Sequence, residues 1–284
     1  MIKEIYKLIR LFGKKIQDDH IPAYSAQAAF FIIISFFPFI MLVISIVKYL
    51  PITESSMLLL FSKLFPSGVN SMVVSIVNNI YKTDSSMTLI SITAITTLWS
   101  AGKGFLAIMK GLNKVFTINE TRGYLYLRLT SAFYTLIFAI MVVVTMVLFV
   151  FGNRLYIWIE KKIPILADMA LLIISVRTLI GLVTLVIFFI LIFLFIPNRK
   201  AKVMQEFPGA LISAAGWMGF SYAFSFYIDN FSNFSATYGS LTVIVLFMLW
   251  MYFLMYILFI GAQFNRLLED KTFATRVKSI YKKP

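Results

Sequence analysis

The chain has 284 residues, of which 60% are hydrophobic and only 13% are charged, and its mean hydropathy is +0.89. A soluble domain needs more charged surface than this, so the composition excludes a soluble fold and makes lipid the solvent of most of the chain. The net charge of +14 would indicate nucleic-acid binding in a soluble protein, but in a membrane protein the same excess is expected on cytoplasmic loops.

The first 27 residues predict a cytoplasmic amphipathic helix rather than a membrane span. Apolar side chains between Ile2 and Ile16 recur on one helical face, and lysine and arginine lie opposite. Such a helix lies along the membrane interface, or equally well packs on the protein's own cytoplasmic loops. The apolar run that follows is too long for a signal peptide.

Residues 28–264 predict a single membrane domain with an all-α fold, a bundle of six transmembrane helices. A bilayer core needs about 20 consecutive apolar residues in a helix, and the period-2 alternation of barrel strands is absent. The runs that qualify are Ala28–Val47, Met87–Met109, Ser131–Phe151, Met169–Ile196, Pro208–Ile228 and Gly239–Phe264. Between the first two runs, short external helices are expected around Met57–Phe65 and Val69–Tyr81.

The distribution of lysine and arginine predicts that both termini are cytoplasmic. With these six spans, nineteen basic residues fall on the side of the N-terminus and seven on the other side. Basic residues are retained on the cytoplasmic side of bacterial membranes. Residues 265–284 then form a basic cytoplasmic tail.

Irregularities in the first, second and fifth spans are the places where function is predicted. Pro38 predicts a kink in the first span. The segment 99–104, Trp-Ser-Ala-Gly-Lys-Gly, interrupts the second, either as an unwound segment of the kind that binds substrates in transporters or as a helix leaving the membrane early. Small residues in the fifth span predict close helix packing, with a substrate groove at Ser213 as the alternative. The loop 229–238 predicts an external turn or a headgroup contact.

A series of short motifs follows in order and spacing along residues 20–268. They are Ala28-Ala29-Phe30 with Ser35 and Pro38, Leu98-Trp99-Ser100, Gly104-Phe105, Leu112-Asn113, Pro197-Asn198, Pro208-Gly209-Ala210, Tyr238-Gly239-Ser240, Leu249-Trp250 and Gly261-Ala262-Gln263-Phe264-Asn265. Together they resemble the YihY/BrkB family of bacterial inner-membrane proteins. Gln263 stands where that family usually has an acidic residue, and Lys103 where it usually has a small one. The resemblance implies a six-span envelope protein, whose relatives are labelled virulence factors or ribonuclease BN.

The leading functional hypothesis is movement of a lipidic or amphipathic envelope molecule across or within the inner membrane. A scaffold that transports nothing and organises envelope or division partners is the alternative. Membrane lipids are the expected partners, and self-association is left open. The candidate substrate-contact residues are Ser35, Pro38, Trp99, Ser100, Lys103, Ser213, Asp229, Asn233, Tyr238 and Gln263.

Ribonuclease activity is a third hypothesis, and the residues disfavour it. Phosphodiester hydrolysis generally needs a metal held by clustered carboxylates or histidines, or a general acid paired with a general base. The only histidine, His20, is contiguous with Asp18 and Asp19 and has no second cluster to meet. We therefore expect no enzymatic activity, no metal, no cofactor and no nucleic-acid partner.

Overall fold

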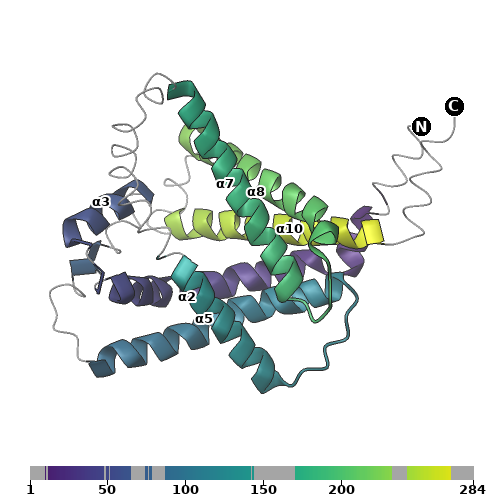
Figure 1. Ribbon diagram of the computed structural model, residues 1–284, viewed down its shortest axis with the longest axis horizontal. Helices are drawn as coiled ribbons and strands as arrows, with labels where there is room; N and C mark the ends of the chain where they lie inside the picture. Colours follow the sequence, from purple (N-terminus) through teal and green to yellow (C-terminus); the bar gives the residue numbers. More distant parts are fainter. Residues whose placement is uncertain are drawn as a thin grey trace.

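The computed structural model describes residues 10, 12–47, 49–50, 52–64, 74–75, 77–78, 87–141, 143, 170–231 and 242–269, and its elements there are helices. A short helical segment covers residues 12–18, and a helix that we call the crossing helix covers Tyr124–Met141. The helices labelled in Figure 1 are α2 (Ile21–Val47), α3 (Glu54–Leu64), α5 (Met87–Val115), α7 (Ala170–Phe195), α8 (Val203–Phe231) and α10 (Thr242–Glu269). The all-α class is confirmed.

The helices extend beyond the predicted apolar runs at their charged ends. Helix α2 and the crossing helix each begin seven residues before the predicted span, and α5 continues past Met109. A charged residue ends an apolar run, but it does not end a helix whose backbone hydrogen bonds continue into the interface. Helix α3 confirms that a short helix lies near Met57–Phe65, and its external position stays a prediction. The one expected at Val69–Tyr81 and the end of the predicted third span lie mostly outside the described residues.

Of the two interpretations of residues 99–104, the unwound segment is wrong, because α5 runs as a continuous helix through them. A helix that leaves the membrane early stays a prediction. The glycines of this segment serve close packing: a Cβ on Gly104 would lie 3.0 Å from Ile32 of α2, and one on Gly102 would lie 3.5 Å from the Ala132 nitrogen of the crossing helix. The kink predicted at Pro38 is confirmed, since α2 bends by 50° between its Ile21–Phe36 and Pro38–Ile44 parts.

Three of the described helical segments are long and apolar enough to cross a membrane, and the bent helix α2 makes up to a fourth. The three are Tyr124–Met141, Val203–Ile228 and Ile244–Glu269, and Gly181–Phe195 of α7 is a shorter apolar helix. The chain is therefore a multi-pass helical protein. The number of six spans and the cytoplasmic position of both termini remain predictions.

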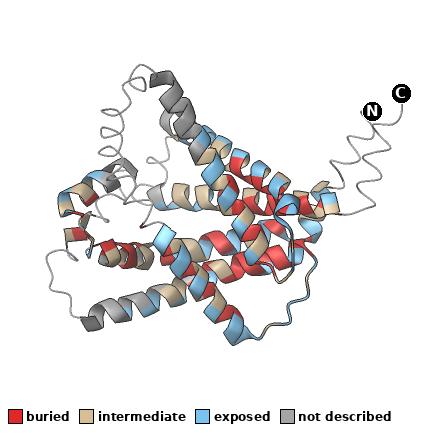
Figure 2. Ribbon diagram, in the orientation of Figure 1, coloured by how far each residue is buried: buried red, intermediate tan, exposed pale blue. Residues whose placement is uncertain are grey.

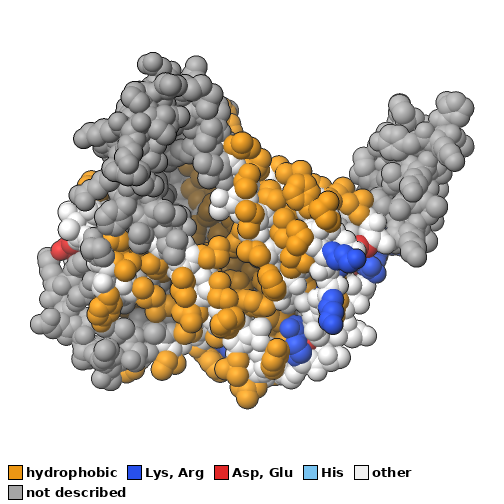
Figure 3. Space-filling view, viewed as in Figure 1, with side chains coloured by type: hydrophobic (Ala, Val, Ile, Leu, Met, Phe, Trp, Pro, Cys, Tyr) orange, Lys and Arg blue, Asp and Glu red, His pale blue; other side chains and the backbone are white. Residues whose placement is uncertain are grey.

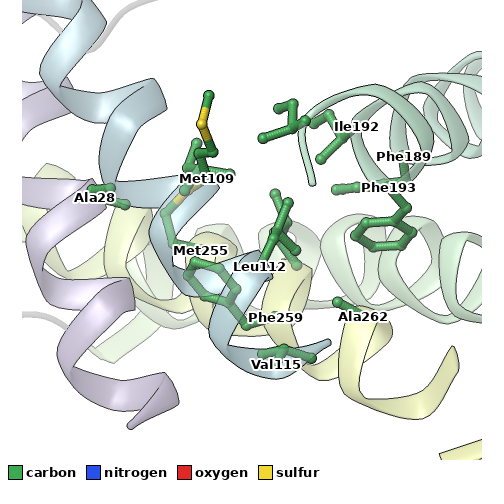
Figure 4. Close-up of a cluster of buried hydrophobic side chains, with 14 of the residues drawn as sticks. Ala28, Met109, Leu112, Val115, Phe189, Ile192, Phe193, Met255, Phe259 and Ala262 are labelled. Carbon is green, nitrogen blue, oxygen red and sulfur yellow. The ribbon is translucent and has the colours of Figure 1, made fainter. Parts of the chain in front are cut away.

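The main hydrophobic core forms where α2, α5, α7 and α10 converge. Helix α2 lies along α5, α10 packs on α8 and α2, and α7 packs on α8 (Figure 1). Buried residues concentrate in the half of the molecule that contains the C-terminal part of α5 (Figure 2). Side chains from these four helices point toward one another in this core (Figure 4), among them Ala28, Met109, Leu112, Phe189, Phe193 and Phe259.

The backbones of α8 and α10 touch at a pair of glycines. A Cβ on Gly209 would collide with the carbonyl oxygen of Gly261, and a Cβ on Gly261 would collide with Oγ of Ser213. The Ser213 hydroxyl donates to the carbonyl oxygen of Ile257 at 3.4 Å. Small residues of the fifth predicted span thus allow close helix packing, as the sequence indicates.

Candidate functional site

Candidate residues from the first and second predicted spans meet where α2 packs on α5. Ser35 of α2 is buried, and its Oγ donates to the Phe31 carbonyl at 2.6 Å and lies 3.3 Å from Oγ of Ser100. The ammonium of Lys103 lies 5.6 Å from the centroid of the Phe31 ring. Pro38 follows Ser35 by one turn and marks the bend of α2. Residues that are distant in sequence therefore form one polar region between two apolar helices.

Arg128 of the crossing helix reaches this region from the other side of α5. Its side chain is packed so tightly that the residue is only 3% exposed. Its Nη2 donates to the carbonyl oxygen of Trp99, and its guanidinium carbon lies 4.3 Å from the centroid of the Trp99 ring. We call the group Ser35, Trp99, Ser100, Lys103 and Arg128 the Trp99 seam.

Helical geometry places Trp99 and Lys103 on a strip of α5 between its two neighbours. Residues four apart lie on the same helical face, so Lys103 follows Trp99 by one turn. On one side of this strip Ser100 and Gly104 contact α2, and on the other side Gly102 contacts the crossing helix. Lys103 is exposed, and Trp99 is 55% exposed although its ring lies against a buried guanidinium.

Arg128 holds a buried positive charge that no carboxylate neutralises among the described residues. Its Nη1 is buried and has no hydrogen-bond partner, and the ion pairs found in the described part of the chain do not include it. Burying an unpaired charge is costly, so such a group in a membrane helix is a functional-site hypothesis by default. This feature makes the Trp99 seam the candidate site.

Sequence analysis missed Arg128 because it assigned the residue to a cytoplasmic loop. The predicted third span began at Ser131, so Arg128 was counted among the basic residues before it. One signal in the sequence indicated otherwise. The apolar run Tyr124–Met141 begins directly after Gly123, and Arg128 is the one charged residue within it. An apolar run that contains one internal charge predicts a single long helix, in which the charged residue is a candidate buried group.

The remaining candidate residues do not join the Trp99 seam. Ser213 belongs to the contact between α8 and α10. Gln263 of α10 is fully buried, and neither its amide oxygen nor its amide nitrogen has a hydrogen-bond partner in the described structure. Asp229 lies in the last turn of α8, and Asn233 and Tyr238 lie outside the described residues.

A second polar group, which we call the loop network, ties residues 196–202 to α8 and α10. Arg199 pairs with Glu206 and, at 2.7 Å, with Glu269, and its guanidinium carbon lies 3.5 Å from the centroid of the Phe116 ring. Asn265 donates to the Glu206 carboxylate at 2.9 Å and accepts from the Gly209 nitrogen at 2.6 Å. Gly209 and Asn265, which belong to the motifs of the family resemblance, thus stabilise the contact between α8 and α10.

The loop after α5 is held by a further carboxylate. Asn113 donates to Glu120 at 2.6 Å and accepts from the Asn198 backbone nitrogen at 3.0 Å. Glu120 also pairs with Arg122 at 2.7 Å. The hydrogen bond from Arg122 is the main reason that the pKa of Glu120 falls from its usual 4.5 to about 2.

The residues considered for hydrolytic chemistry occupy the turn before α2. Asp19 is buried, and its Oδ2 has no hydrogen-bond partner among the described residues. Burial raises the pKa of Asp19 against the opposing charges of Lys15, Lys114 and Arg266. His20 is exposed and has a positive φ of 54°. Within the described ranges, no three His, Cys, Asp or Glu residues are grouped as metal ligands would be.

The surface separates apolar and basic regions. In the face shown in Figure 3, hydrophobic side chains cover most of the described surface, and lysine and arginine appear toward the right-hand end. A lipid-exposed belt with basic residues beyond it is the pattern expected of a membrane protein.

Comparison with known proteins identifies bacterial relatives along most of the chain. The chain is 31% identical over 248 residues to the ribonuclease-like protein YfkH of Bacillus subtilis (strain 168), covering 87% of this chain and 90% of the relative. It is 22% identical over 272 residues to a UPF0761 membrane protein of Alteromonas mediterranea, covering 92% of this chain and 87% of the relative. A UPF0761 membrane protein of Pseudoalteromonas atlantica is 22% identical over 275 residues, covering 92% and 85%. No solved structure matches. The family model for virulence factor BrkB matches residues 12–283, and the chain therefore belongs to the BrkB family of multi-pass membrane proteins.

Proposed function

We propose that the protein moves a lipidic or amphipathic envelope molecule within or across the membrane, and that the Trp99 seam contacts this substrate. The observation that supports the proposal is Arg128, a buried cation that has no counter-charge among the described residues and lies beside a half-exposed tryptophan. Charged groups inside membrane helices are retained where they lie on a substrate or ion path, because their desolvation is otherwise uncompensated.

The surroundings of the seam suit an amphipathic substrate. The crossing helix exposes large apolar side chains, among them Leu125, Leu129 and Phe133. A substrate held by its polar end at the seam can therefore keep its apolar part in lipid. The bend at Pro38 adds a place where the two halves of α2 can change their angle, since proline removes one backbone hydrogen bond of the helix.

The test is lipid exchange between leaflets in liposomes that contain the full-length protein. A phospholipid with a fluorescent acyl chain is incorporated in both leaflets, and an impermeant quencher reports how fast inner-leaflet probe reaches the outside. We expect faster exchange than in protein-free liposomes, and a roughly tenfold decrease for Arg128→Gln, about the effect of losing one charge-assisted hydrogen bond.

The matched control is Tyr222→Ala, which removes an exposed aromatic side chain of α8 outside the seam. This variant should exchange lipid at the wild-type rate. If wild-type protein leaves exchange at the protein-free rate, transport is rejected. Partners recovered by crosslinking in cells would then favour the scaffold function.

We also propose that the protein is not a ribonuclease, although one relative has a ribonuclease-like name. Asp19 is buried among basic residues and His20 points into solvent, so the two do not form a general acid and base around a shared substrate. Purified protein should leave RNA intact. Cleavage that is lost in the Asp19→Asn and His20→Ala variants would overturn this proposal.

A further inference from the structure

We infer that the Trp99 seam recognises an anionic phosphate-ester headgroup, so that the substrate class is anionic amphiphiles. This inference rests on the proposed function and gives the substrate of that function its chemical class. It is argued from the charge of the seam, from the hydrogen bond that Arg128 leaves unmade, and from the position of the seam along the crossing helix.

The charge of the seam requires an anion. Its ionisable members are Arg128 and Lys103, both cationic, and neither forms an ion pair within the part of the chain that the structure describes. A zwitterionic headgroup brings one positive and one negative charge, so it does not neutralise the positive charge of the seam. An anionic headgroup supplies the missing negative charge, and burying it against a cation recovers part of the desolvation cost of Arg128.

The hydrogen bonding of Arg128 leaves one donor available. Nη2 donates to the Trp99 carbonyl oxygen, whereas the buried Nη1 has no acceptor in the part of the chain that the structure describes. Phosphate oxygens are strong acceptors for guanidinium N–H groups. The ring of Trp99 lies over the guanidinium and is 55% exposed, and Nη1 lies beside Gly102 of α5, 3.7 Å from where a Cβ would stand on that glycine. Lys103, one turn along α5, adds a second, flexible donor for the same anion.

The position of Arg128 matches the depth of lipid headgroups. The apolar run of the crossing helix begins at Tyr124, and Arg128 lies four residues later, about 6 Å along the helix axis. Tyr124 and Tyr126 are 66% and 57% exposed at this end. Exposed tyrosines near the end of a membrane helix mark the interface, where their rings lie at headgroup level. Phosphate esters are the anions that lipids present there.

The experiment measures binding of lipids to the purified full-length protein in neutral detergent, by native mass spectrometry. The probes are phosphatidylglycerol, phosphatidylcholine with the same acyl chains, and inorganic phosphate. We expect the wild-type protein to bind phosphatidylglycerol at least tenfold more tightly than phosphatidylcholine, as one additional charge-assisted contact would give. Equal binding of the two lipids would overturn the inference.

Variants then assign the selectivity to the seam rather than to basic loops in general. Arg128→Gln should lose the preference for phosphatidylglycerol, and Arg128→Lys, which keeps the charge, should retain part of it. Lys103→Gln should weaken the preference a few-fold, since this exposed residue adds only a flexible second contact.

The matched control is Lys110→Gln, which replaces another exposed lysine of α5. This variant should bind both lipids as the wild type does. An equal effect of Lys103→Gln and Lys110→Gln, with none from Arg128→Gln, would overturn the assignment.

Two further arms separate the possible failures. Inorganic phosphate should compete weakly with phosphatidylglycerol, because it lacks the acyl chains. If inorganic phosphate bound as tightly as the lipid, the site would be one for free phosphate, and the inference that the anion is a lipid headgroup would be overturned.

Exchange assays with both lipids separate the inference from the proposed function. Equal exchange of both lipids contradicts the headgroup class alone, whereas selective binding with no exchange contradicts transport alone.

Discussion

Two arginines of this protein, the buried Arg128 and the partly buried Arg199, occupy opposite electrostatic environments. Arg199 of the loop network pairs with two carboxylates, Glu206 and Glu269, and of its three nitrogens only Nε has no hydrogen-bond partner within the described ranges. Arg128 of the Trp99 seam meets a carbonyl oxygen and an aromatic face but no carboxylate in the described structure. Both guanidinium groups also lie against an aromatic ring, so the difference between them is the counter-charge.

This difference separates a structural charge from a functional one. A buried charge that is neutralised by its own protein is stable in every state of that protein, whereas a buried charge without a counter-ion is most stable when something else supplies the anion. The family resemblance passes through residues near both sites, so resemblance alone does not distinguish them. The partners of each arginine do.

The largest effect is expected for Arg199→Met, which leaves the fully buried carboxylate of Glu206 without its cation. Breaking a buried ion pair by removing one partner costs about 3–5 kcal/mol. Denaturant-induced unfolding in detergent should show a decrease of this size, and Arg199→Met combined with Glu206→Leu should recover much of it. An unfolding free energy unchanged by Arg199→Met would show that the pair contributes nothing, and the comparison would fail.

A smaller decrease is expected for Gly261→Ala, which tests the glycine contact beside the loop network. The added methyl group would collide with Ser213 and with the backbone of α8, and overpacking of this kind costs roughly 1–3 kcal/mol. Gly219→Ala on α8 is the control, because nothing lies within 4 Å of its added Cβ. Thermal unfolding should rank the two variants in this order. Equal melting temperatures would contradict the close packing.

Acid should weaken the loop after α5 through Glu120. The pKa of Glu120 is lowered from 4.5 to about 2 in the folded protein, so its contribution to stability is complete above pH 4.5 and is lost as the pH falls toward 2. Glu120→Gln should lower stability by about 1 kcal/mol at neutral pH, as expected for a partly exposed ion pair. The variant should also lose part of the acid sensitivity. Identical pH profiles for wild type and variant would exclude this role.

The smallest effect on stability, below about 1 kcal/mol, is expected for Arg128→Met. This change removes a hydrogen bond and a cation–π contact, but it also removes an unpaired buried charge, and the two effects oppose each other. Adding phosphatidylglycerol should raise the melting temperature of the wild type and not that of the variant, since a ligand stabilises the folded state that binds it. A loss as large as that of Arg199→Met would make Arg128 a structural residue.

The helices of the fold were predictable because apolar runs of membrane length can form little else. The continuity of α5 through residues 99–104 could not be predicted in the same way. Each glycine lowers helix propensity by about 1 kcal/mol, so the sequence left an unwound segment at residues 99–104 open as one of two interpretations, whereas in the structure Gly102 and Gly104 pack against neighbouring helices. The local sequence does not reveal this packing energy, because the neighbouring residues belong to α2 and the crossing helix.

The site was predictable in part. Ser35, Ser100, Trp99 and Lys103 were candidates because they stand out in apolar runs, but their proximity depends on how α2 packs on α5. Arg128 was missed because a charge was taken as the end of a span. The partners of a charged residue decide whether it belongs to a loop or to a buried site, and partners far away in sequence are a property of the fold.

The glycine contact between α8 and α10 also limits how the molecule can move. Sliding either helix along its axis would bring Ala210 or Ala262, both buried, toward a spot where the backbones leave no room for a methyl group. The contact therefore opposes sliding of α8 along α10. Shear motion is left to the other interfaces, and the hinge nearest to the seam is the bend of α2 at Pro38.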